Sequence, residues 1–147
     1  MKETSVDPTR LGTLDPALVL IVEDEEPLAE TISFIVREAG YTPVVALHGM
    51  QALELARTRK PALLITDLMI PYLDGAALIG AIRAAAAVVG ESSPPVILIT
   101  AANAVRARAA GADVILRKPF YLADLEELLR RFLGAPVDSE TDSHNNA

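Results

Sequence analysis

Four points along this sequence carry the side chains best suited to chemistry, and each stands at or just beyond the end of a short apolar run. These side chains are Glu23 with Asp24, then Asp67, Thr100 and Lys118. Carboxylates gathered at one place repel each other and raise their own pKa values unless a cation lies among them. Mg²⁺ is a hard ion that suits such oxygen ligands and keeps several waters. A lysine and a hydroxyl opposite the metal would complete a cradle for a phosphoryl group, whose oxygens need compensating charge during transfer.

Taken alone, each of these residues has a simpler explanation. An acid such as Asp67 after a strand can be a loop residue that caps the next helix, and the other side chains can be solvated loop polars. The chemical interpretation therefore depends on whether the fold brings the four points together.

Alternating apolar and amphipathic segments predict five strands and five helices. The strands are expected at 18–22, 41–47, 62–66, 95–99 and 114–116. The helices are expected from Pro27 to about Ala39, over 50–59, from Asp74 to about Ala87, over 102–110, and from about Tyr121 to Phe132. Continuous apolar runs are typical of strands buried on both faces, as in a parallel sheet covered by helices. The carboxyl ends of such strands share one edge, where open α/β sheets bind their ligands.

Two residues predict local features of this fold. Asp74 is expected to cap the third helix, because its side chain can accept from a free amide of the first turn. Pro43 cannot donate to a ladder of strand hydrogen bonds, so the second strand is expected at an edge of the sheet.

Composition limits the classes of function. The 147 residues fit one domain, expected at 16–133, between a polar arm at 1–15 and an acidic tail at 134–147 that are both expected to be disordered. The absence of cysteine excludes disulfides and cysteine-based metal or redox chemistry. No apolar run approaches the roughly 18 residues that span a bilayer, and no signal-peptide core is present, so a cytoplasmic protein without membrane contact is expected. The net charge of −7 argues against nucleic acid as the main partner.

Four motifs, in order along the chain, resemble those of the receiver domain of two-component response regulators. They are Val22-Glu23-Asp24-Glu25, the segment from Thr66-Asp67 to Asp74-Gly75, Thr100-Ala101 and Lys118-Pro119-Phe120. The resemblance covers roughly residues 17–133. It implies a doubly wound (βα)5 flavodoxin-like α/β fold, with a five-stranded parallel sheet of order 2-1-3-4-5.

The resemblance also implies a role for each acidic residue. Asp67 matches the residue that accepts a phosphoryl group from a sensor histidine kinase or a phosphotransfer protein. Asp24 matches the main carboxylate ligand of Mg²⁺, and Glu23 matches its partner, which more often acts through a water. The backbone carbonyl of Met69 would be a further metal ligand, beside Asp67 itself.

Three further positions match residues that respond to the phosphoryl group. Lys118 matches the lysine that pairs first with the acceptor carboxylate and then with the phosphoryl oxygens. Thr100 matches the switch hydroxyl, which is drawn inward on activation, and Ala101 is small where bulk would obstruct the phosphoryl group. The Lys118–Pro119 peptide bond is often cis in such domains.

Some positions depart from the family pattern. Lys118 follows Thr100 by 18 positions, about one helical turn fewer than usual, so the fourth helix or its flanking loops must be shorter. Ile115, the second switch position, stands where the family commonly has a Tyr or Phe that swings with the threonine, and it offers neither a ring to flip nor a hydroxyl to bond. Met69 and Ala102 lie where side chains tune attack by water, and neither can orient a water, so slow self-dephosphorylation is expected.

The expected function is that of a stand-alone receiver, a signalling module and not an enzyme, which binds a downstream protein when phosphorylated. The 13 residues after Gly134 are too few for a DNA-binding or enzymatic output domain, so no direct DNA binding is expected. A homodimer is compatible with this function. Arg106, Arg108 and Arg117 are interpreted as solvated charges in preference to a basic patch for an acidic partner.

Two other functions stay open. A phosphorylation-independent adaptor would keep the fold and lose the switch; Ile115 and the short fourth helix favour it, whereas the intact acids, threonine and lysine oppose it. A Mg²⁺-dependent phosphatase of the haloacid-dehalogenase type also uses an Asp nucleophile, but it places Asp-x-Asp on the first strand. Here the first strand ends in Glu23-Asp24-Glu25, and the residue two after Asp67 is Met69.

Overall fold

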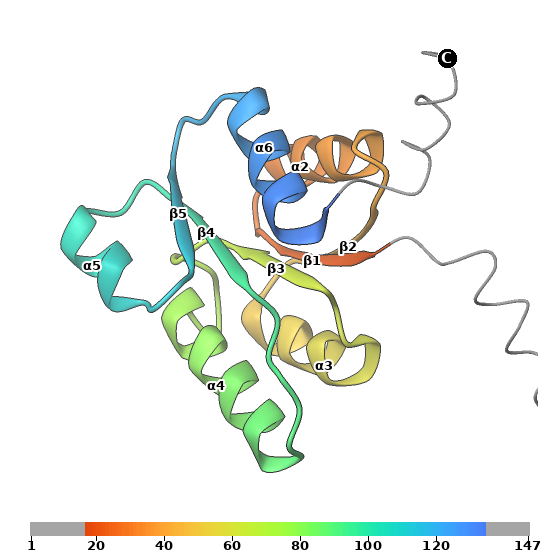
Figure 1. The fold of residues 1–147 in the computed structure, drawn as a ribbon. Coiled ribbons are helices and arrows are strands. Elements are labelled where there is room, and N and C mark those ends of the chain that lie inside the picture. The colour runs from red at the N-terminus through yellow and green to blue at the C-terminus, as the bar shows by residue number, and fades with distance from the viewer. Residues whose placement is uncertain (1–16, 135–147) are drawn as a thin grey trace, which may run out of the picture.

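The computed structural model of the protein describes residues 17–134, which form one parallel sheet covered by helices on both faces (Figure 1). The strands are β1 Leu18–Val22, β2 Thr42–Ala46, β3 Leu63–Thr66, β4 Val96–Thr100 and β5 Val114–Arg117. The helices are α2 Glu26–Glu38, α3 Gly49–Arg59, α4 Gly75–Val88, α5 Ala104–Ala109 and α6 Leu122–Leu133. The sheet order is β2-β1-β3-β4-β5, so the predicted doubly wound fold is confirmed. The predicted arm at 1–15 and the predicted tail beyond Gly134 lie outside the described residues.

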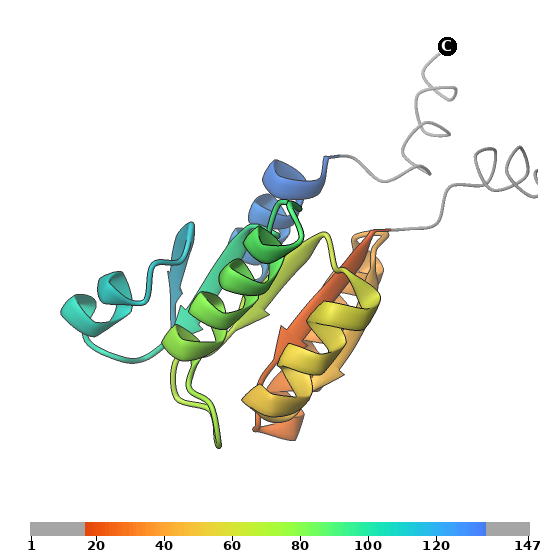
Figure 2. The same ribbon diagram turned by 90° about the horizontal axis from the view of Figure 1, so that it is seen from below.

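Alternate side chains of the strands enter two separate apolar layers. In β1, Val19 and Ile21 pack with α2 and α6, whereas Leu20 and Val22 pack with α3, α4 and α5. Figure 2 shows α3 and α4 side by side against one face of the sheet. Because both faces are covered, the central strands are apolar except for the threonines that end β3 and β4, which is why continuous apolar runs in the sequence indicated these strands correctly.

Pairing between neighbouring strands brings the four polar points to one edge of the sheet. At the β1–β3 pair, Asp67 N donates to Val22 O at 3.2 Å, which sets Glu23 beside Asp67. At the β4–β5 pair, Lys118 N donates to Thr100 O at 3.0 Å, which sets these two residues side by side. β2 forms one edge of the sheet, as Pro43 predicted.

Side chains at three helix starts accept from amides that the helix itself leaves free. His48, Asp74 and Asn103 cap α3, α4 and α5, each through the amide three residues later. The predicted cap at Asp74 is confirmed, with 2.8 Å from Ala77 N to Asp74 Oδ1. Helix α5, which lies between Thr100 and Lys118, has only six residues and is the shortest of the described helices.

Gly75 joins the start of α4 to the segment that follows Asp67. Its amide donates to Leu68 O at 2.8 Å. A Cβ on Gly75 would lie 2.3 Å from the carbonyl oxygen of Asp67 and 2.8 Å from Leu68 Cα, both closer than Cβ atoms approach other heavy atoms in proteins. Only glycine therefore allows α4 to begin this close to the end of β3.

The two glycines of α4 give a matched test of this contact. We expect Gly75→Ala to lower the free energy of unfolding by about 1–3 kcal/mol, because backbone must move to admit the methyl group. Gly80 has nothing within 4 Å of its would-be Cβ. Gly80→Ala in the same helix is therefore expected to raise the free energy of unfolding by about 0.5–1 kcal/mol, through the higher helix propensity of alanine. Urea unfolding of both variants measures these changes, and equal shifts of the same sign would contradict the close approach.

Candidate functional site

Lys118 joins two buried acids at the carboxyl edge of the sheet. Its Nζ lies 2.7 Å from Asp67 Oδ2 and 3.4 Å from Glu23 Oε1. Asp67 is 7% exposed and Glu23 is 2% exposed, so both carboxylates are nearly removed from solvent. The three residues directly follow β3, β1 and β5, and only the assembled sheet brings them together.

Burial and charge act in opposite directions on the pKa values of these groups. Burial raises the pKa of Glu23 against the lowering effects of the Glu25 amide and Lys118, and the charge of Asp67 raises it further. Burial alone lowers the pKa of Lys118, but the hydrogen bond and charge of Asp67, together with Glu23, outweigh it, so the pKa of Lys118 is raised. The lysine is thereby held in its charged form between the two acids.

The loop after β3 orients the Asp67 carboxylate. Its Oδ1 accepts from Leu68 N at 2.6 Å and from Met69 N at 3.2 Å, while Oδ2 faces Lys118. Both oxygens therefore have donors, which offsets the unfavourable free energy of burying the charge. An oriented carboxylate beside a fixed cation is a nucleophile suited to an electrophilic centre that carries negative oxygens, such as phosphorus.

Thr100 lies fully buried at the end of β4, with its hydroxyl bound to the loop that follows. Thr100 Oγ1 accepts from Ala102 N at 3.0 Å. The carbonyl oxygen of the same Ala102 accepts from the guanidinium of Arg117, the residue before Lys118. Arg117 is exposed, as expected of a solvated charge, and its guanidinium also contacts this loop.

Ile115 lies away from the carboxyl edge. It pairs with Leu98 across β4 and β5. Its half-buried side chain packs against the apolar layer under α3, α4 and α5, as does Ala102. The second switch position is therefore occupied by an ordinary core contact.

Oxygen donors of the kind that Mg²⁺ prefers stand at this edge. Asp24 is exposed next to the buried Glu23, and the Met69 amide is bound to Asp67, so the Met69 carbonyl belongs to the same short loop. Within residues 17–134, no three His, Cys, Asp or Glu side chains are grouped to hold a metal ion. Mg²⁺ is usually held by one or two carboxylates plus waters. The acids and the loop carbonyl therefore fit its demands without a cage of three acids.

The rim beside Asp67 is formed by an apolar and a basic side chain. Met69 is 56% exposed. Its sulfur lies 3.5 Å from Arg106 Nη2, which reaches across from α5. A thioether here offers only a weak acceptor to a water near Asp67.

The geometry brings together most of the residues singled out in the sequence. Glu23, Asp67, Thr100 and Lys118 meet at one edge, and Asp24 lies there on the solvent side. The residue that sequence reasoning missed is Arg117. Its position in the sequence could have indicated it, since this long basic side chain directly precedes Lys118 at the end of the same strand.

Comparison with known proteins places the chain among relatives of one kind. It matches the family described as the response regulator receiver domain over residues 19–130. It is 38% identical over 115 residues to the transcriptional regulatory protein PdtaR of Mycobacterium tuberculosis, covering 75% of this chain and 53% of that protein. It is 31% identical over 128 residues to the DNA-binding response regulator MtrA of Mycolicibacterium paratuberculosis, covering 84% of this chain and 54% of that protein. The chain thus spans about half the length of the curated relatives it matches.

Solved structures give the same result. The receiver domain of a sensor histidine kinase from Pseudomonas aeruginosa, with a magnesium ion in its active site cleft, matches with a TM-score of 0.70 and 28% identity, covering 82% of this chain and 99% of that one. The chemotaxis protein CheY4 of Vibrio cholerae matches with a TM-score of 0.71 and 27% identity, covering 80% and 99%. The sequence motifs, the sheet order and these matches agree, and the chain belongs to the receiver domains of two-component response regulators.

Proposed function

We propose that this receiver accepts a phosphoryl group on Asp67 from the phosphohistidine of a sensor histidine kinase or a phosphotransfer protein. The observation that carries the proposal is the 2.7 Å contact between Lys118 Nζ and an acceptor carboxylate whose other oxygen is held by two amides. A carboxylate oxygen attacks phosphorus, the bond from phosphorus to the histidine nitrogen breaks, and that nitrogen leaves with the electron pair. The product is an acyl phosphate on Asp67.

The side chains of Lys118 and Thr100 can interact with the negative oxygens of the phosphoryl group. Lys118 pairs with Asp67 before transfer and with the phosphoryl oxygens after it, while its contact with Glu23 keeps it at the edge of the sheet. Thr100 has a hydroxyl proton to donate to a phosphoryl oxygen, since its bond to Ala102 N uses the oxygen as acceptor. Ala101 leaves room for the group between them.

Glu23, Asp24, Asp67 and the carbonyl of Met69 are the groups that would hold Mg²⁺. When bound, the ion supplies positive charge at the oxygens of the transferring group. The magnesium ion in the active site cleft of the Pseudomonas receiver supports this assignment. The exposed position of Asp24 supports it as well, because an ion that keeps several waters needs a ligand on the solvent side.

We propose that the phosphorylated protein signals by binding a downstream protein in the cytoplasm. Receiver domains act as phosphoryl acceptors in signalling and not as enzymes in the usual sense. Within the described part of the chain, no helix is long and apolar enough to cross a bilayer. That this chain itself does not bind DNA rests on its net charge of −7 and stays a prediction, since the relatives include DNA-binding regulators about twice as long.

The family match favours this function over the phosphatase. An adaptor that has lost the switch is opposed by the presence of the whole set of acids, threonine and lysine at one edge, with Lys118 in contact with Asp67. The core position of Ile115 is the observation that favours the adaptor.

Phosphorylation by acetyl phosphate tests the acceptor directly. In the presence of Mg²⁺, the wild-type protein is expected to gain one phosphoryl group by intact mass, and Asp67→Asn is expected to gain none, because an amide is not a nucleophile at this site. A wild type that gains none and does not bind Mg²⁺ would establish the adaptor. Multiple turnover on a small phosphomonoester would establish the phosphatase.

The metal assignment is tested by substitution of its solvent-side ligand. We expect Asp24→Asn to raise the Mg²⁺ concentration needed for half-maximal phosphorylation by at least about tenfold, because a ligand charge is lost. Glu26→Gln removes the same charge from the exposed start of α2 and is the matched control. Equal effects of the two substitutions would show that Asp24 acts only through the net charge.

The lifetime of the acyl phosphate tests whether the side chains beside Asp67 can orient a water for its hydrolysis. After removal of the donor, the phosphoryl group on the wild type is expected to persist for minutes or longer, since neither Met69 nor Ala102 can orient a water. Met69→Asn is expected to shorten this lifetime several-fold by supplying an amide that can do so. Met50→Asn makes the same change at an exposed position on α3 and should leave the lifetime unchanged. Loss of the group within seconds from the wild type would contradict this account.

A further inference from the structure

We propose that Arg117 is a positioning residue that latches the β4–α5 loop and so holds the Thr100 hydroxyl in its unphosphorylated place. This inference rests on the proposed phosphorylation of Asp67 and adds the element that controls the response. The site residues bind the phosphoryl group, whereas Arg117 acts on them only through the backbone of the loop.

The first step of the argument is the pair of contacts that hold Ala102. Its amide donates to Thr100 Oγ1 at 3.0 Å, and its carbonyl oxygen accepts from the guanidinium of Arg117. One residue is therefore held at both ends of its backbone, by the threonine on one side and by β5 on the other. Thr100 cannot move toward Asp67 unless Ala102 moves with it or releases it.

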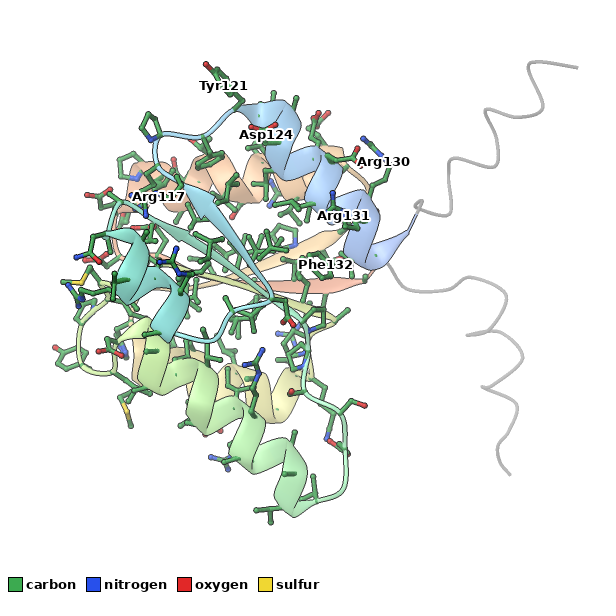
Figure 3. The ribbon with its side chains drawn as sticks, turned by 60° about the vertical axis from the view of Figure 1, so that its left-hand side comes forward. Arg117, Tyr121, Asp124, Arg130, Arg131 and Phe132 are labelled. Carbon is green, nitrogen blue, oxygen red and sulfur yellow. The ribbon has the colours of Figure 1, made fainter. Side chains whose placement is uncertain are left out.

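The second step is the position of Arg117 on the sheet. Thr100 and Arg117 are partners across β4 and β5, and Lys118 N donates to Thr100 O at 3.0 Å. Arg117 is thus fixed to the same strand end as the lysine that binds Asp67. Figure 3 shows Arg117 at the carboxyl end of β5, far from Arg131 and Phe132 at the opposite end of this face.

The third step is the face from which Arg117 projects. Residues two apart on a strand point to the same side, so Arg117 leaves β5 on the side where Ile115 packs under α5. Ile115 has no hydroxyl and no ring, so it makes no polar contact with the loop. Arg117, two residues further along β5 at the carboxyl edge of the sheet, supplies that contact, because its long side chain reaches the carbonyl of Ala102.

These contacts define a two-state device. In the latched state Arg117 holds Ala102, and Ala102 holds the hydroxyl of Thr100. In the other state the hydroxyl is turned toward a phosphoryl group on Asp67, and the loop has followed it. A contact made in only one of two states shifts their populations by its own free energy, so weakening the latch favours the second state.

The test uses beryllofluoride with Mg²⁺ as a mimic of the phosphoryl group on the full chain. We expect Arg117→Met to bind beryllofluoride about two- to tenfold more tightly than the wild type, the range for the net contribution of a typical hydrogen bond. Arg117→Lys keeps the charge and a donor group but shortens the side chain, so its affinity should lie between those of Arg117→Met and the wild type. Arg108→Met removes the same charge from the exposed surface of α5 and should bind as the wild type does.

Nuclear magnetic resonance separates a latch from a purely structural contact. Without beryllofluoride, the Ala102 amide and Thr100 methyl signals of Arg117→Met are expected to move part of the way toward their positions in the bound wild type, and those of Arg117→Lys less far. A contact that only stabilises the fold would lower the melting temperature without this movement. If Arg117→Met does not fold, Arg117→Lys decides by the same two measurements.

The possible outcomes separate the latch from the function on which it rests. Wild type that binds beryllofluoride, with unchanged affinity and unmoved signals in both Arg117 variants, would overturn the latch alone. Weaker binding by Arg117→Met would overturn it too, because it would place the guanidinium in the responding state. Wild type that binds no beryllofluoride would overturn the proposed function and the latch together, and the acetyl phosphate experiment on Asp67 would then fail independently.

Discussion

The arrangement depends on one lysine that lies between two buried carboxylates. Glu23 and Asp67 are each less than a tenth exposed, and without Lys118 two like charges would be held side by side away from water. Removing one partner of such a group leaves an uncompensated buried charge, which strongly destabilises a fold. The position of β5 beside β4, where Lys118 N donates to Thr100 O, therefore brings the cation to the two acids.

Much of this could be predicted from the sequence because the fold follows from patterns of burial. A parallel sheet covered on both faces favours strands made almost wholly of apolar residues, and β1, β3 and β4 are of that kind, with a polar residue only at the last position of β3 and β4. The same rule predicted that their polar successors meet, since all carboxyl ends lie on one edge. The cap at Asp74 was predictable for an equally local reason, because a short acid before an apolar helix meets its free amides.

Other features depend on tertiary geometry and leave no local signal. Of two neighbouring acids, Glu23 is buried against Lys118 while Asp24 faces solvent, and nothing in the pair itself decides which one turns inward. The Asp-Gly turn was recognisable, but the approach of Gly75 to the backbone of Asp67 requires knowing where α4 begins in space. Arg117 was interpreted as solvated because that is the commoner arrangement of such arginines, and its contact is with a loop carbonyl that only the folded chain brings near.

The separation of the paired residues along the chain also has a consequence for how the protein folds. Glu23 and Lys118 are 95 positions apart, so their contact forms only after nearly the whole described chain has closed on itself. The two acids gain their cation only when β5 is in place beside β4. The lysine that pairs with the Asp67 carboxylate thus also links the last strand to the centre of the sheet.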